Sequence, residues 1–405
     1  MALEIRPITD DEVEQAEYIR AYSFNTQDRA NLAEQTEMVR RVFPADWSLA
    51  SFEDGEMTAF LRTVPMAVRI NGHGLSFGAV GPVVSLPQHR RKGHVGALLR
   101  HALSDMRDRG QVLSGLHTPH PALYRRYGWE IASERRTFTF APKDIELRVE
   151  PSERGRTRML APDDWAQADR VYRQYAAMRN GPIHRGEVWW REGVFSVSGP
   201  SIGDVALWED ESGDPQGYAV YYQKRHWEDG FPPFWVRELV ALTTDAYLNL
   251  IGHLLRHDLP EKIILPAPPD DPFLSVVTEA QRVKVEHEYD VMLRLVDVEA
   301  ALRMRALAYP EHDLSFTMTL TDSSAPWNEG AYRIEVANGE TSVERTSGEG
   351  DFSLSATVLA PLFSGYLSIR SAQLGGLVSV ANQAALANAE AFFATMYAPF
   401  CSDMF

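Results

Sequence analysis

The sequence contains a single cysteine, Cys401, among its 405 residues. One thiol cannot build a disulfide framework or a zinc cluster with thiolate ligands, so neither kind of cross-link holds this chain together. The chain also has no uninterrupted apolar run of the length that a membrane-spanning helix needs, about 20 residues, and its first residues contain no apolar targeting segment. We therefore expect a cytoplasmic protein without a membrane partner.

Positive charge is scarce as well. The chain has 40 lysines and arginines against 56 acidic residues, which gives a formal net charge of −16. A surface that binds nucleic-acid phosphates needs a basic face, so this balance argues against a nucleic-acid partner. An acidic protein attracts cationic small molecules instead, although the same charge also serves solubility.

Two common phosphate-binding motifs are missing too. The chain has no G-x-x-x-x-G-K-[ST] loop and no G-x-G-x-x-G turn that opens a βαβ unit. Its length allows roughly two to four domains, and a hydrophobic fraction of 44% supports globular packing throughout. An anion site, if there is one, must have another form.

Residues 83–106 provide that form, because a strand, a basic turn and a helix follow one another there. The short apolar run Val83–Leu86 must end at Pro87, and an apolar stripe at three- and four-residue spacing from Val95 to Met106 predicts an amphipathic helix that stops at Gly110. The first N–H groups of that helix lack intrahelical acceptors, and Gly93 lets a ligand approach them. The basic side chains of the turn add positive charge, although a basic turn can also be simply solvated: Arg90, Arg91 and Lys92.

In this context the turn Arg90–Val95 resembles the pyrophosphate loop of the GCN5-related N-acetyltransferases, which binds acetyl-coenzyme A. Val95 stands where the family has a small residue, and Gly96 follows it. The resemblance implies that the strand backbone and the turn hold the cofactor through the following residues: Val83, Val84, Arg90, Arg91, Lys92, Gly93, His94, Val95 and Gly96.

A second motif of the same superfamily lies after the next strand, which we predict at 111–116. The segment LYRRYGWE, 123–130, resembles the short helix beside the cofactor thiol, and Tyr124 matches the tyrosine that serves as general acid. A phenol with a reference pKa of about 10 stays protonated at neutral pH and can donate to a departing thiolate, whose reference value is about 8.5. Packing is the alternative role, and we prefer it for Tyr127. His117 and His120 are weaker candidates, since most such loop histidines are solvated.

Residues 151–295 repeat the pattern of residues 1–150 without the cofactor signals. A helix begins near Trp165, and the strand 235–242 and the helix 244–257 occupy the places of the first motif. The turn between them has no Arg-Arg-x-Gly, and Asp245 would repel a pyrophosphate. His253 and His257 have metal-ligand spacing, but the glutamate of the zinc-peptidase motif is missing, so we predict packing histidines and no metal.

From residue 296 the composition changes, and Asn338-Gly339 predicts a tight hairpin. The segment 358–366 resembles the closing part of sterol carrier domains. The whole chain thus resembles the enhanced intracellular survival (Eis) family of N-acetyltransferases. This resemblance implies an α/β (α+β) fold with two tandem acetyltransferase domains, the second degenerate, and a sterol carrier-like α+β domain. The expected boundaries are 1–150, 151–295 and 296–405.

The resemblance also implies the activity. Family members move acetyl from acetyl-CoA to a primary amine of an aminoglycoside, a polyamine or a lysine, and are commonly hexamers. The amine attacks the thioester directly, so Cys401 need not be a nucleophile. Three residues in an aromatic and acidic stretch are candidates for binding a cationic amine, with core packing as the alternative for the aromatic ones: Phe24, Asp28 and Trp47.

The last seven residues, 399–405, are aromatic and apolar where a free terminus is usually polar, so we expect this segment to be docked. In the Eis family the terminal carboxylate serves as the base for the amine, and here it belongs to Phe405. An α-carboxylate with a pKa near 3.5 is a weak base in water, so this role requires burial or a bridging water. The alternative is that Phe405 has only a structural role and packs against the third domain. The alternative function is a lipid or small-molecule carrier that uses the third domain, with a regulatory first domain.

Overall fold

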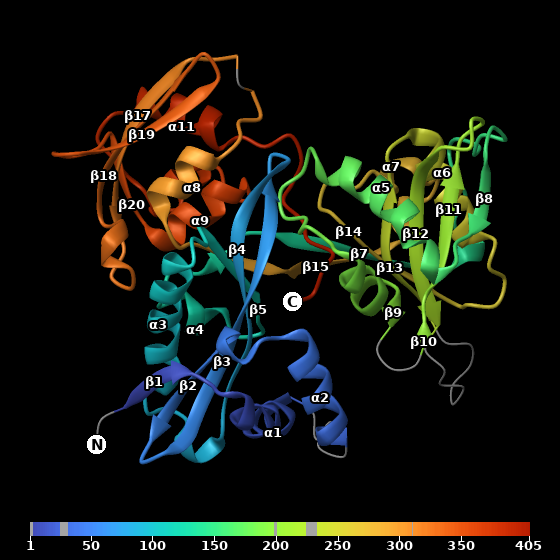
Figure 1. The fold of residues 1–405 in the computed structure, drawn as a ribbon. Coiled ribbons are helices and arrows are strands. Elements are labelled where there is room, and N and C mark those ends of the chain that lie inside the picture. Colours follow the sequence, from blue (N-terminus) through green and yellow to red (C-terminus); the bar gives the residue numbers. More distant parts are fainter. Residues whose placement is uncertain (1–2, 25–30, 198–200, 224–232, 310) are drawn as a thin grey trace.

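The computed structural model describes residues 3–24, 31–197, 201–223, 233–309 and 311–405. The chain forms three units, each built on its own β-sheet, and the final segment runs between them to the centre of the molecule (Figure 1). Within the described residues, the sheets of the first two units have seven strands each and that of the third has five, and the short strands Ser196–Val197 and Ser201–Ile202 form a separate pair. The predicted division into two similar α/β units and an α+β unit is therefore confirmed.

The first sheet has the strand order β1-β2-β3-β4-β5-β16-β6. At the start of its first helical segment the Thr9 N–H donates to the Glu12 carboxylate at 2.9 Å, which makes a capping box. Asn71 and Gly72 have φ of 45° and 83° and form the tight turn between β3 and β4. The unit comprises β1 (Glu4–Pro7), η1 (Asp10–Glu12), α1 (Val13–Phe24), α2 (Leu32–Val42), η3 (Ala45–Trp47), β2 (Ser48–Glu53), β3 (Glu56–Ile70), β4 (His73–Ser85), η4 (Pro87–His89), α3 (His94–Asp108), β5 (Leu113–His117), α4 (Pro121–Arg125) and β6 (Glu130–Ile131).

The strands β4 and β5 diverge in the middle of this sheet. They pair in parallel only where Phe77–Ala79 meets Leu113–Gly115, whereas β4 continues to Ser85. The predicted strand at 83–86 is thus the end of one long strand. Beneath the sheet, α3 buries the stripe that its sequence predicts, including Leu98, Leu99 and Met106. The diverging strands leave the backbone of β4 beyond Ala79 without a β5 partner.

The second sheet has the order β15-β7-β14-β13-β12-β11-β8 and repeats the first in outline. Its parallel pair, β13 and β14, is also short, joining Phe234–Trp235 to Ile263–Ile264. The unit comprises β7 (Glu134–Phe140), η5 (Pro142–Asp144), β8 (Arg156–Met159), η6 (Pro162–Asp164), α5 (Trp165–Ala176), the π-helix η7 (Trp189–Val194), β9 (Ser196–Val197), β10 (Ser201–Ile202), β11 (Asp204–Glu209), β12 (Pro215–Gln223), β13 (Phe234–Ala241), α6 (Thr244–Leu255), β14 (Ile263–Ala267), α7 (Phe273–Val276), η8 (Ala280–Arg282) and β15 (Lys284–Tyr289).

The chain passes from sheet to sheet earlier than the predicted boundary at 150. β6 ends in the first sheet at Ile131, while β7, which begins at Glu134, already pairs with β14 and β15 of the second. The chain returns between β15 and β16 (Val291–Leu295), and β16 pairs with β5 and β6 of the first sheet. Residues 142–155, around the expected boundary, connect β7 to β8 within the second unit.

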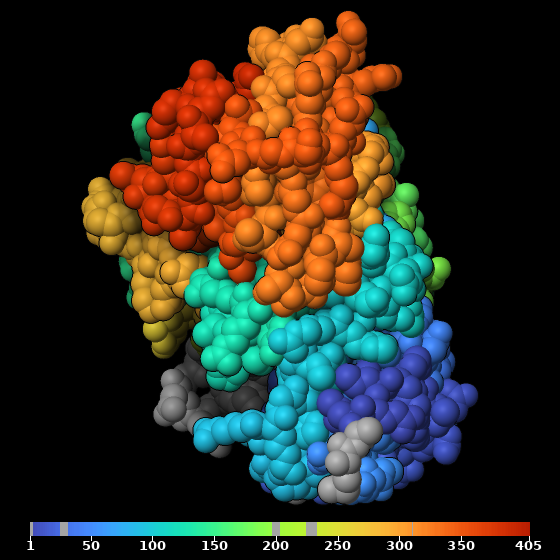
Figure 2. Space-filling view, turned by 90° about the vertical axis from the view of Figure 1, so that its left-hand side faces the viewer, coloured from blue at the N-terminus to red at the C-terminus, as the bar shows by residue number. Residues whose placement is uncertain are grey.

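The third unit is a five-stranded sheet covered by helices, and Figure 2 shows it (orange to red) seated on the first unit (blue to teal). Asn338 and Gly339 have φ of 53° and 80°, so this hairpin also forms as predicted. One apolar core joins the two units, because Phe77 and Leu293 of the first sheet pack with Phe316 of the third. The unit comprises α8 (Val298–Met304), β17 (Leu314–Thr321), η9 (Pro326–Asn328), β18 (Gly330–Ala337), β19 (Glu340–Thr346), β20 (Phe352–Ser355), α9 (Ala356–Ser364), α10 (Ile369–Leu374), β21 (Ser379–Val380) and α11 (Ala385–Phe393).

Substitutions at the tip of the β3–β4 hairpin can test how closely this tip packs against the second unit. A Cβ at Gly72 would overlap the carbonyl oxygen of Ala177 in the second unit, whereas a Cβ at Gly55, which has nearly the same positive φ, would meet nothing within 4 Å. Gly55→Ala should therefore cost only the left-handed backbone strain, about 1–2 kcal/mol. Gly72→Ala should lower the thermal unfolding midpoint clearly further, as followed by circular dichroism. Equal midpoints for the two variants would contradict the close packing at Gly72.

Candidate active site

The basic turn between β4 and α3 is open at its glycine. Gly93 precedes α3 with φ of 91°, Arg91 has φ of 62°, and a Cβ at Gly93 would meet nothing within 4 Å. Arg90, Arg91 and Lys92 are exposed. A phosphate group can therefore approach the first N–H groups of α3 with three cations around it, and the residues of this turn fit the pyrophosphate of acetyl-CoA.

The side chains of the other residues that we predict to bind the cofactor point inward. Val84 is buried in the core beneath α1, and the His94 ring is buried 4.0 Å from the Glu53 carboxylate. A Cβ at Gly96 would overlap the phenol oxygen of Tyr127, so the glycine makes room for that ring. Val83 and Val95 pack at the border of the core under α3. These residues would therefore contact a cofactor through their backbone atoms.

Tyr124 lies in α4, the helix that follows β5, and is buried in the core with Leu98 and Leu99. Burial raises the pKa of Tyr124 to about 12, against a smaller lowering by its hydrogen bond with Thr118. The phenol therefore keeps its proton at any pH near neutrality. Tyr127 packs against Gly96, with the Arg100 guanidinium 5.1 Å from its ring centre, which is the packing role predicted for it.

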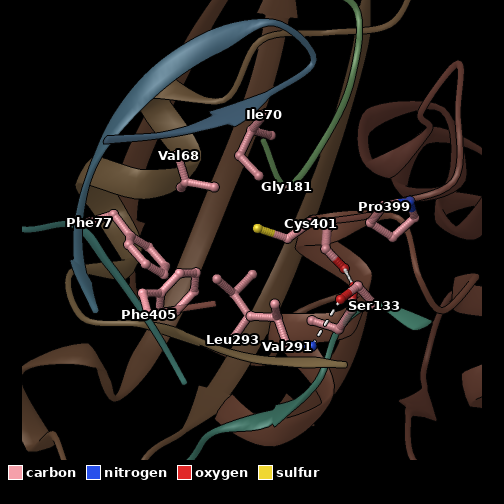
Figure 3. A pocket seen from close by; sticks show the side chains of 12 residues that line it. Val68, Ile70, Phe77, Ser133, Gly181, Val291, Leu293, Pro399, Cys401 and Phe405 are labelled. Carbon is pink, nitrogen blue, oxygen red and sulfur yellow. Dashed lines mark hydrogen bonds between the residues drawn. The ribbon is translucent and has the colours of Figure 1, made fainter. Parts of the chain in front are cut away.

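The final segment is docked, as predicted. Figure 3 shows the Phe405 ring beside Phe77 and the Cys401 thiol pointing into a small apolar cavity of about 30 Å³. The two phenyl rings meet edge to face at 5.5 Å. The carboxyl carbon of Phe405 lies 3.8 Å from the Cβ position of Gly81. Since Gly81 lies on the part of β4 that has left β5, this carboxyl group sits beside the gap in the sheet.

We expected both loop histidines to be solvated, but His117 is not. It ends β5, and its Nδ1 lies 3.2 Å from the Asp290 carboxylate and its Nε2 3.1 Å from the backbone oxygen of Asp403. Its ring also packs at 4.8 Å against Phe405. His120, by contrast, is exposed. Pairing across β5 and β16 brings Asp290 to this place, which no local sequence pattern could reveal.

A buried ion cluster also escaped the sequence analysis. Arg185, in the connection between α5 and η7, has only 1% of its side chain exposed and pairs with Glu238 of β13 at 2.7 Å and Asp403 at 3.1 Å. Burial alone would raise the pKa of Glu238, but Arg185, Ser402 and Tyr218 lower it to about 2. Burial likewise lowers the pKa of Arg185, while Asp403 and Glu238 raise it well above the usual value. Glu238 and Arg185 are therefore both charged.

A wide pocket of about 900 Å³ separates the first unit from the second. Trp47, one of the residues that we predict to bind substrate, lines this pocket, whereas Phe24 is not among the lining residues: that side chain is 64% exposed at the end of α1. Asp28 lies outside the described residues. The lining combines aromatic, acidic and basic side chains from both units: Arg41, Val42, Phe43, Trp47, Val64, Pro65, Met66, Ala67, Ile183, His184, Gly186, Glu187, Val188, Trp189, Arg191 and Glu192.

The second unit lacks the open turn of the first. Thr243 caps α6 by accepting from the Ala246 N–H at 3.2 Å, so a side chain already occupies the helix start. The predicted packing role of the α6 histidines holds: His253 lies 2.8 Å from the Tyr221 hydroxyl, and burial lowers its pKa to about 4. Among the described residues no group of His, Cys, Asp and Glu could hold a metal ion, and no helix is long and apolar enough to span a membrane.

Comparisons with known proteins divide the chain in the same way. Models of the acetyltransferase (GNAT) domain match residues 4–132 and 181–295, and a model of the sterol carrier protein domain matches residues 298–402. An uncharacterized N-acetyltransferase of Streptomyces avermitilis is 28% identical over 84% of this chain and 83% of its own. N-acetyltransferase Eis of Mycobacterium tuberculosis is 25% identical over 75% of this chain and 73% of its own.

Solved structures extend the likeness to the whole chain. Eis1 from Mycobacterium abscessus is 26% identical and superposes with a TM-score of 0.81, covering 99% of this chain and 100% of its own. A GCN5-related N-acetyltransferase from Anabaena variabilis has the same fold, with a TM-score of 0.87 over 100% of both chains at 20% identity.

The two acetyltransferase units define an acetyl-CoA-dependent N-acetyltransferase. The chain belongs to the GNAT acetyltransferase family and has the three-part organisation of its Eis-like members.

The phosphate-binding role of the turn can be tested at Gly93 with a matched pair of variants. Asn and Asp have the same shape and both tolerate positive φ better than other residues, so Gly93→Asn measures the effect of a side chain and Gly93→Asp adds the negative charge. Coenzyme A should protect the Asn variant from thermal unfolding more than the Asp variant, in which protection should vanish. Equal protection of both folded variants would remove the turn from the cofactor site.

Proposed function

We propose that the enzyme acetylates a primary amine of a cationic small molecule, of aminoglycoside or polyamine type, or of a lysine. The amine attacks the thioester directly, the Phe405 carboxylate acts as base, and Tyr124 acts as general acid. Acetyl-CoA supplies the acetyl thioester. The turn 90–96 and the backbone of β4 at Val83 and Val84 hold it, so that much of the rate enhancement comes from positioning.

The observation that carries this proposal is the position of the Phe405 carboxyl carbon. It lies 3.8 Å from the point that a Cβ added at Gly81 would occupy. β4 has no β5 partner there, so a cofactor that follows the backbone of β4 would pass close to the carboxylate. The Phe405 ring packs against Phe77 at the border of the apolar core, so the residue that bears the carboxylate is partly withdrawn from water. Burial makes a carboxylate a stronger base.

Tyr124 serves the other side of the reaction. Its raised pKa means that it acts as a hydrogen-bond donor to the departing sulfur and does not ionise in the working pH range. As the C–S bond of the thioester breaks, Tyr124 gives its proton to the sulfur, whose thiol pKa the desolvated surroundings raise as well, and the tyrosinate then regains a proton from solvent. The buried Cys401, whose thiol pKa burial raises well above its usual value, has no part in this mechanism.

The pocket between the units supports a cationic acceptor. Glu187 and Glu192 line it together with the rings of Trp47 and Trp189, which attract cations through their faces. Arg41 and Arg191 also line the pocket and balance the formal charge of these two carboxylates, and Arg191 pairs with Glu187 at 2.8 Å. The net charge of −16 on the whole chain adds long-range attraction. By resemblance to its family, we expect the enzyme to work in the cytoplasm as a homo-oligomer, a hexamer.

Removing the Tyr124 hydroxyl tests the acid. Tyr124→Phe should lower turnover by roughly 100-fold, the usual range for general acid catalysis, with unchanged coenzyme A affinity. Because the phenol does not ionise near neutrality, the alkaline side of the pH–rate profile should have the same shape in both proteins. Tyr127→Phe is the control and should keep nearly full activity. A near-normal rate for Tyr124→Phe would return this residue to a packing role.

Moving the carboxylate tests the base. One glycine added after Phe405 shifts the group by about 3.5 Å, further than proton transfer tolerates, and leaves the turn and Tyr124 unchanged. Turnover should fall sharply while coenzyme A still protects the protein from thermal unfolding. Full activity of the extended, folded and correctly assembled enzyme would exclude the carboxylate. Protection by apolar ligands but not by coenzyme A would favour the carrier function.

A further inference from the structure

The second unit has lost its cofactor turn, yet it supplies most of the polar contacts of the final segment. The Phe400 N–H donates to the backbone oxygen of Asn180 at 2.9 Å. The Ser402 hydroxyl donates to Glu238 at 2.6 Å and accepts from Arg185 at 2.9 Å. All these contacts come from the connection between α5 and η7 or from β13. They fix the path of the chain over the residues just before the terminal carboxylate.

Asp403 is the most strongly held residue of this segment. Its carboxylate accepts from Arg185 Nε at 3.1 Å and from the indole N–H of Trp189 at 2.7 Å, and its backbone oxygen faces His117 at 3.1 Å. The side chain of Asp403 is fully buried. A carboxylate withdrawn from water in this way stays in place only while its partners remain, because leaving a buried charge unpaired is costly.

Arg185 is itself fixed on every side. The Glu238 carboxylate accepts hydrogen bonds from both terminal nitrogens of Arg185 at 2.7 Å. The centres of the Tyr172 and Trp190 rings lie 3.8 and 4.7 Å from the guanidinium carbon of Arg185. Such a bidentate pair leaves the guanidinium a single orientation, in which Nε faces Asp403. From Asp403 only two residues lead to the carboxyl group beside Gly81.

We infer that Arg185 of the second unit is a positioning residue for the reaction in the first unit, and that its ion pair with Asp403 sets the place of the Phe405 carboxylate beside β4. The inference rests on the proposed role of that carboxylate as base. It gives the second unit a function that does not need a cofactor: it holds the end of the chain at the active site. Arg185 acts through Asp403 and does not touch the reacting atoms.

The first experiment tests the anchor without using activity. Asp403→Asn keeps the shape of the side chain and an oxygen for Trp189 but removes the charge that Arg185 holds. A carboxypeptidase should release Phe405 and Met404 at least about tenfold faster from this variant than from the wild type, because release requires the segment to leave its site. Glu209→Gln, which breaks an ion pair with Arg158 at the far edge of the second sheet, is the control and should leave release unchanged. Wild-type release from Asp403→Asn would overturn the inference.

The second experiment links the anchor to catalysis. Asp403→Asn should lower kcat by roughly 10- to 100-fold with little change in coenzyme A affinity, since small displacements of a catalytic group have effects of this size. In the enzyme extended by one glycine after Phe405, the same substitution should have almost no further effect, because the carboxylate is already displaced. Equal losses in both backgrounds would show that Asp403 acts by another route. Full activity of the extended enzyme alone would instead refute the proposed base, and the release assay would still report on the anchor.

Discussion

The exchange of strands between the two acetyltransferase units is the constraint on which the rest of the molecule depends. β7 leaves the first unit to pair in the second sheet, and β16 returns from the second unit to complete the first. Each crossing is made through backbone hydrogen bonds, so the units cannot rotate against each other without breaking a ladder. The wide pocket between β3 and the segment 183–192 and the seat of the final residues both require this fixed arrangement.

Local sequence signals predicted the elements well wherever a short-range physical cause operates. Asn71-Gly72 and Asn338-Gly339 form the tight hairpins because their residues accept positive φ. The stripe from Val95 to Met106 forms α3 because its apolar side chains share one face, and Gly93 precedes that helix as the motif requires. The docked end was also foreseeable, because five of the last seven residues are aromatic or apolar and are unsuited to a free terminus.

The remaining features depend on contacts between distant parts of the chain. Arg185 meets Asp403 across 218 residues, and neither residue lies in a recognisable motif. The boundary at residue 150 was wrong for the sheets because β7 looks like any other strand, and only its partners show which sheet it joins. Phe24 has an aromatic side chain in the expected stretch, but the direction of α1 turns it to solvent. Sequence alone cannot supply these directions.

The long β3–β4 hairpin joins two regions that would otherwise have little to do with each other. At its tip, the Asn71 amide donates to the backbone oxygens of Ala306 and Ala394 in the third unit, and Gly72 abuts Ala177 in the second. At the opposite end, β4 leads into the phosphate-binding turn. The ladder between the two strands is interrupted once, by a register shift between Leu61 and Thr63. One pair of strands therefore contacts the second and third units at its tip and continues at its other end into the turn before α3.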